Sequence, residues 1–183
     1  TDPAHTTTTP ADVAFTTAYL DDLRRVIEGL DAHSIATAIE WMRQTRDADG
    51  TIFICGNGGS ASIASQMVVD IVKGASLRKA TRFKMIGLTD SIATITAYAN
   101  DEGYETVFEE PLKNFARAGD LVIGISGSGN SPNVLNAIEY ANETGCKTIG
   151  LTTGESGRLR ELVDLPLLVP STHMGRLEDC FFI

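Results

Sequence analysis

The feature that most constrains this chain is a pair of loops rich in glycine and hydroxyl side chains, each between an apolar run and a helical pattern. Residues 56–60 read Gly-Asn-Gly-Gly-Ser, and residues 126–131 read Ser-Gly-Ser-Gly-Asn-Ser. The apolar runs before them, 52–55 and 121–125, are typical of buried parallel strands. Backbone N–H groups at the start of a helix carry the positive end of the helix dipole and bind anions. The two loops therefore predict one shared site for a phosphorylated small molecule.

The rest of the chain alternates between strand and helix patterns. Expected strands cover residues 51–55, 83–88, 120–126, 147–151 and 165–169, and expected helices cover 60–72, 91–98, 104–116, 131–144 and 157–162. This alternation predicts an α/β fold, a three-layer αβα sandwich around a five-stranded parallel sheet. Ligands of such sheets bind at the carboxyl ends of the strands. Both loops are expected at that edge.

The two ends of the chain carry further expectations. Residues 1–10 have almost no apolar content and are expected to form a disordered tail, followed by a single domain over 11–183. Two helices are expected between 11 and 47, with a break near Gly29. The first has an apolar stripe but no strand to cover, so we expect it to pack on another subunit or across the domain. A last helix begins near Arg176 and stops after about two turns, so we expect its continuation to be missing from this sequence.

Composition excludes several classes of partner. The formal net charge is −9, which argues against direct binding to nucleic acid or to a membrane surface. No apolar run is long enough to span a membrane, and the first residues lack a signal-peptide pattern, so a cytoplasmic location is expected. The three cysteines are far apart and show no disulfide framework or zinc-type pairing, and Cys55 and Cys146, in or beside apolar strand patterns, are expected to be small core residues.

Other phosphate-binding motifs match the first loop poorly. Gly56 and Gly58 would begin a dinucleotide fingerprint, and Ala61 at its last position is an accepted variant, but no acidic residue closes the second strand. The lysine of a P-loop is also absent. A plain strand-to-helix turn needs fewer glycines and serines than these loops contain. The pattern therefore favours a small phosphorylated ligand held by backbone amides and hydroxyls.

The sequence of both loops resembles the sugar isomerase (SIS) domain, and within that superfamily the phosphoheptose isomerase group. The resemblance is carried by Gly-Asn-Gly-Gly-Ser and by Ile-Ser-Gly-Ser-Gly-Asn-Ser-Pro-Asn-Val, each before a helix. Three shorter matches follow the same order and spacing: Thr89-Asp90, Asn100-Asp101 and Val169-Pro170. The similarity implies a flavodoxin-like SIS domain preceded by N-terminal helices, and an assembly of two or four subunits.

The resemblance also implies roles for particular residues. Phosphate contacts are implied for Ser60, Ser126, Ser128 and Ser131, with the backbone of Gly58, Gly59 and Gly127, and sugar contacts for Asn57 and Asp90. The group's catalytic histidine and glutamate, one turn apart, correspond here to Gln66 and Asp70. The glutamine of its final helix corresponds to Glu178, and a later histidine would lie beyond residue 183.

These departures leave two functions open. The leading hypothesis is an isomerase that converts a seven-carbon ketose phosphate to its aldose phosphate, with Asp70 as the base and Glu178 and His173 as further catalytic candidates. No cofactor is predicted as a requirement, and the zinc-containing members of the group suggest Gln66, Asp70 and Glu178 as ligands of a divalent metal such as zinc. The alternative is a non-catalytic module that binds a phosphosugar or a protein partner in a regulatory role.

Overall fold

Five parallel strands form a single sheet. The computed structural model describes residues 8–154 and 157–181. The strand order is β2-β1-β3-β4-β5, which is the flavodoxin-like order. The strands are β1 (Thr51–Gly56), β2 (Lys84–Gly87), β3 (Leu121–Ile125), β4 (Lys147–Thr153) and β5 (Leu165–Val169). All five predicted strands are confirmed.

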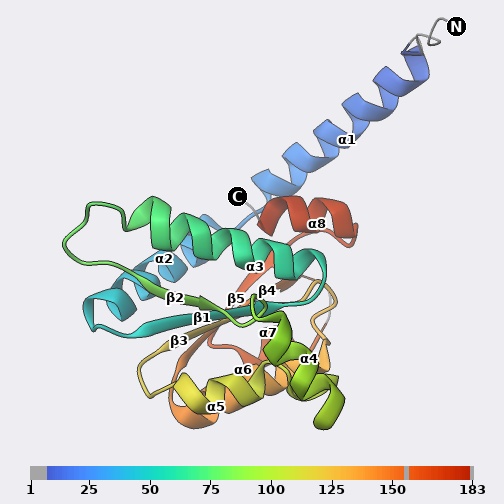
Figure 1. Cartoon of the computed structure of the whole chain (residues 1–183). Helices are drawn as coiled ribbons and strands as arrows, with labels where there is room; N and C mark the ends of the chain where they lie inside the picture. The colour runs from blue at the N-terminus through green and yellow to red at the C-terminus, as the bar shows by residue number, and fades with distance from the viewer. Residues whose placement is uncertain (1–7, 155–156, 182–183) are drawn as a thin grey trace, which may run out of the picture.

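Helices cover both faces of the sheet (Figure 1). One face packs against α2 (Ala32–Asp47), α3 (Gly59–Val69) and α8 (Met174–Phe181). The other packs against α4 (Ile92–Asp101), α5 (Glu109–Phe115), α6 (Pro132–Thr144) and α7 (Leu159–Leu162). Each face has its own cluster of buried apolar side chains, so the predicted three-layer sandwich is confirmed.

The N-terminal region forms two helices with the expected break. Helix α1 (Pro10–Glu28) begins with a capping box between Thr9 and Asp12, and the next helix begins at the N-cap Asp31. Residues 1–7 of the expected tail lie outside the described residues. Helix α1 buries none of its residues and projects away from the sheet (Figure 1). No helix in the described part of the chain is long and apolar enough to cross a membrane.

Two expected helices differ from the structure. The helix predicted over 60–72 changes at Asp70 into a π-helix, η1 (Asp70–Ala75). The buried Ser76 hydroxyl stabilises this wider turn by donating to the carbonyl of Ile71, five residues earlier. The helix predicted over 104–116 is divided into a 3-10 turn, η2 (Tyr104–Thr106), and α5. Pro111 has no N–H with which to continue a helix through this point.

Candidate active site

Three serine hydroxyls converge in the loop after β3. The Oγ atom of Ser126 lies 2.9 Å from Oγ of Ser131 and 3.5 Å from Oγ of Ser128. Ser131 is the N-cap residue of α6, but its hydroxyl makes no capping bond and faces Ser126 instead. These hydroxyls lie at the N-terminus of a 13-residue helix, where an anion is favoured.

The first loop begins beside the second. Gly56 is in register with Ile125, the residue directly before Ser126. Ser60 lies over Gly56 on the first turn of α3 and is buried. Gly58 has a φ of 55°, which favours glycine. Ser60 makes no hydrogen bond to the other three serines, but the paired strand ends place its turn next to theirs.

The two residues predicted from the sequence to contact the sugar, Asn57 and Asp90, are oriented by hydrogen bonds to neighbouring side chains. Asn57 exchanges hydrogen bonds with Asn133 on α6, each 2.9 Å long. Asp90 follows β2 and accepts a hydrogen bond from the Ser65 hydroxyl of α3. The structure therefore brings Asp90 onto the helix that begins at the first loop. Sequence reasoning missed Asn133, although it stands directly after Ser-Pro at the start of α6.

Gln66 and Asp70 form a pair on the outer face of α3. The amide nitrogen of Gln66 donates to both carboxylate oxygens of Asp70, each at 3.1 Å. Both side chains are exposed. Asp70 stands where α3 becomes the π-helix, and such transitions are frequent at functional sites. The predicted spacing on one helix face is confirmed.

Helix α8 lies across both loops. A Cβ on Gly127 would collide with the Met174 side chain, and a Cβ on Gly59 would collide with the Glu178 carboxylate. At both positions the absence of a Cβ leaves room for a side chain of α8. The Glu178 carboxylate lies against Gly59 at the N-terminus of α3, and its catalytic role stays a prediction.

His173 stands at the start of α8. Its ring nitrogen Nδ1 accepts a hydrogen bond from the backbone N–H of Arg176 at 3.4 Å. The ring also meets Tyr19 of α1 edge-on, with 6.2 Å between centroids. No hydrogen bond joins His173 to Gln66 or Asp70, so its catalytic role stays a prediction.

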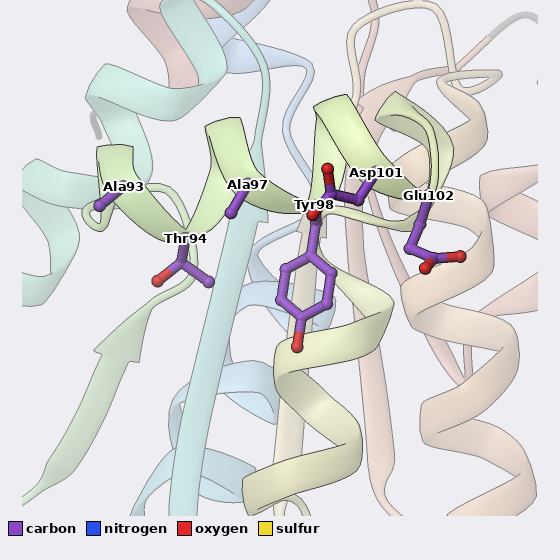
Figure 2. A pocket seen from close by; sticks show the side chains of 6 residues that line it. All are labelled: Ala93, Thr94, Ala97, Tyr98, Asp101 and Glu102. Atoms are coloured by element: carbon purple, nitrogen blue, oxygen red, sulfur yellow. The ribbon is translucent and has the colours of Figure 1, made fainter.

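Two hollows lie outside the serine loops. A shallow hollow of about 440 Å³ follows α4, where Figure 2 shows Tyr98 between Thr94 and the carboxylates of Asp101 and Glu102. An apolar groove of about 480 Å³ lies between α2, β5 and α8. Neither hollow is lined by the loop serines. We therefore place the candidate site where the serine hydroxyls converge, at the carboxyl ends of β1 and β3.

Comparison with known proteins agrees with this geometry. The SIS domain family matches residues 17–153. A phosphoheptose isomerase from Aliarcobacter butzleri is 38% identical over 162 residues, which are 88% of this chain and 85% of that protein. This chain belongs to the SIS domain family, in its phosphoheptose isomerase group.

Solved structures of SIS proteins have the same fold. The phosphoheptose isomerase from Neisseria gonorrhoeae is 31% identical with a TM-score of 0.85, over 96% of this chain and 93% of that one. The phosphoheptose isomerase from Francisella tularensis is 27% identical with a TM-score of 0.87, over 93% and 92%. The predicted SIS fold is therefore confirmed.

The three metal ligands suggested for this SIS domain do not converge. Glu178 lies against Gly59, and Asp70 is eleven residues further along α3, which is about 16 Å of helix rise. Among the described residues no group of three or more histidine, cysteine, aspartate and glutamate side chains could hold a metal ion. Gln66, Asp70 and Glu178 therefore do not fit a zinc site as they stand, and we derive no step through a metal.

The buried cysteines are not nucleophiles. Burial raises the pKa of the Cys55 thiol to about 12 and that of Cys146 to about 11. At neutral pH both are therefore protonated, and a thiol attacks only as the thiolate. Their expected role as core residues is confirmed by their burial.

Replacing Ser128 by alanine tests the phosphate loop. We expect sugar phosphate binding to weaken by about 1–3 kcal/mol, because one donor to a charged group is lost. Calorimetric titration with inorganic phosphate should show a similar loss. Replacing the exposed Ser62 by alanine is the matched control, since no hydrogen bond from its side chain is found among the described residues. Unchanged affinity in the Ser128 variant would show that the Ser128 hydroxyl does not bind the phosphate.

Proposed function

We propose that this chain is a phosphosugar isomerase that converts sedoheptulose 7-phosphate to the aldose heptose 7-phosphate. The observation that carries the proposal is the convergence of Ser126, Ser128 and Ser131 beside a second anion-binding loop, whose helix carries the exposed carboxylate of Asp70. A relative named phosphoheptose isomerase, 38% identical over 88% of this chain, supports the same reaction.

Each part of the site has a role in this proposal. The serine loops hold the phosphate, and Asn57 and Asp90 contact the sugar chain. The base removes a proton from C1 of the ketose to give an enediol, and a proton returns at C2 to give the aldose. Asp70 is the proposed base, and the Gln66 amide orients its carboxylate. The Glu178 carboxylate borders the first loop and is proposed to contact the substrate.

The proposed reaction is tested by incubating the protein with sedoheptulose 7-phosphate in deuterated water. We expect an aldose phosphate that carries deuterium at C2. Binding without isomerisation or deuterium uptake would instead support the second candidate, a phosphosugar-binding module. That candidate is favoured by one observation: Gln66 and Asp70 replace the histidine and glutamate of the group.

We also propose that the enzyme acts as a homodimer or homotetramer whose subunits contact one another through α1. The second half of its apolar stripe, Leu23 and Val26, packs against the core, whereas Phe15 is 75% exposed and Leu20 58% exposed. Helix α1 projects away from the sheet (Figure 1), and exposed apolar side chains on such a helix are typical of an interface. A cytoplasmic location is proposed with it, supported by three free cysteines.

Replacing Phe15 by aspartate is expected to dissociate the assembly. Burial of a phenylalanine contributes about 1.5–3 kcal/mol, and a charge at the interface adds a further cost. We therefore expect the dissociation constant to rise by roughly a hundredfold or more. Sedimentation velocity measures the change. Ala14→Asp, on the opposite face of α1, should leave the mass unchanged, and a wild-type monomer at micromolar concentration would contradict the proposal.

A further inference from the structure

Asn133 is a buried amide that joins the two loops of the candidate site. It is 1% exposed and stands in the first turn of α6, directly after the serine loop. Its partner Asn57 is 76 positions earlier, in the first loop. The two amides bond reciprocally, each nitrogen donating to the other oxygen at 2.9 Å. A buried polar pair of this kind holds both side chains in one orientation.

A backbone donor determines which way the pair faces. The N–H of Val134 donates to Oδ1 of Asn133 at 3.0 Å. A backbone N–H can only donate, so the atom of the Asn133 amide next to Val134 must be the oxygen. The other amide atom of Asn133 is therefore the nitrogen, which donates to the oxygen of Asn57. Asn57 is then oriented in turn, with its oxygen toward the nitrogen of Asn133. The hydroxyl of Tyr104 donates to that same Asn57 oxygen at 2.9 Å.

Counting donors and acceptors shows what Asn57 has left for a ligand. An amide oxygen accepts two hydrogen bonds, and those of Asn57 come from Asn133 and Tyr104. An amide nitrogen donates two, and one of them goes to Asn133. One N–H therefore remains, and the oxygen of Asn57 has no capacity for a further donor.

We propose that Asn133 and Tyr104 are positioning residues that make Asn57 a donor only, directed at an oxygen atom of the bound sugar. The inference rests on the proposed function for the identity of the sugar phosphate. A group that only donates favours a carbonyl or enediolate oxygen, where negative charge develops during isomerisation. Since Asn133 also belongs to α6, the amide pair couples the phosphate loop to the sugar-facing side chain.

Tyr104→Phe removes one O–H and keeps the ring, which is exposed. We expect affinity for sedoheptulose 7-phosphate to fall about three- to tenfold, while affinity for inorganic phosphate stays unchanged, because the serine loop is untouched. The matched control is Tyr98→Phe, the same chemical change on α4 (Figure 2). The Tyr98 hydroxyl makes no hydrogen bond to the described residues, so neither affinity should change. Equal loss for both ligands, or no loss for the sugar phosphate, would overturn the inference.

A double-mutant cycle then asks whether Tyr104 acts through Asn57. In an Asn57→Ala background we expect Tyr104→Phe to have no further effect on kcat or KM, and Asn133→Ala to have little. Additive effects would show that the two residues do not act through Asn57 and would overturn the inference. If the wild type binds the sugar phosphate selectively but does not isomerise it, the proposed function fails, while the two ligand affinities of Tyr104→Phe and its control still test the inference.

Discussion

Asp70→Asn is expected to lower kcat for sedoheptulose 7-phosphate by about 10²–10⁴-fold, the usual contribution of a general base. Asparagine keeps the size of the side chain and removes its ability to take a proton. The KM should change little, because the proposed phosphate site at the start of α3 is about 15 Å of helix rise away. Deuterium incorporation at C2, followed by NMR, reports the loss directly.

The control for Asp70 is Glu143→Gln, which removes one negative charge from an exposed position at the far end of α6. It should retain wild-type kcat. Full deuterium exchange in the Asp70 variant would show that another group is the base. Alanine variants of Glu178 and His173 would then identify it, because these are the remaining catalytic candidates.

Gly56→Ala is expected to lower the free energy of unfolding by about 3 kcal/mol, at the upper end of the cost of overpacking. A Cβ at this position would lie 2.8 Å from Cβ of Ser60 and 2.9 Å from its carbonyl oxygen. The carbonyl belongs to the backbone of α3 and cannot rotate away, so the start of the helix must shift. We also expect sugar phosphate affinity to fall, because Asn57 and Ser60 move with that turn.

Two glycines serve as controls for this effect. A Cβ on Gly74 would meet no atom within 4 Å, and Gly74→Ala should not destabilise the protein. Gly58 has equal space, but its φ of 55° with a ψ of −121° is a backbone conformation that favours glycine, so its alanine variant should lose about 1–3 kcal/mol from backbone strain alone. Urea unfolding of the three variants separates the two causes. A Gly56 variant as stable as the Gly74 variant would show that the start of α3 can shift to accept the Cβ at little cost in free energy.

The comparison between sequence and structure is clearest in the two loops. Alternating apolar runs and helical patterns predicted every strand, the break between α1 and α2 and the position of both loops at the strand ends. Hydrophobic periodicity and glycine placement act over a few residues, so they are visible in the sequence alone. The change to a π-helix at Asp70 was not visible in the sequence. It depends on the Ser76 hydroxyl, which donates to the Ile71 carbonyl and accepts from the backbone N–H of Phe83.

The sequence by itself therefore determined the α/β class, the position of the two glycine- and serine-rich loops at the strand ends and the helix-face pairing of Gln66 with Asp70. Only the tertiary structure decided which side chains from distant segments come into contact at the site. It paired Asn57 with Asn133 across 76 positions and placed Glu178 against Gly59 rather than beside Asp70. The physical reason is that such contacts depend on how the sheet and helices pack, since segments distant in the chain come together only when a common core is buried.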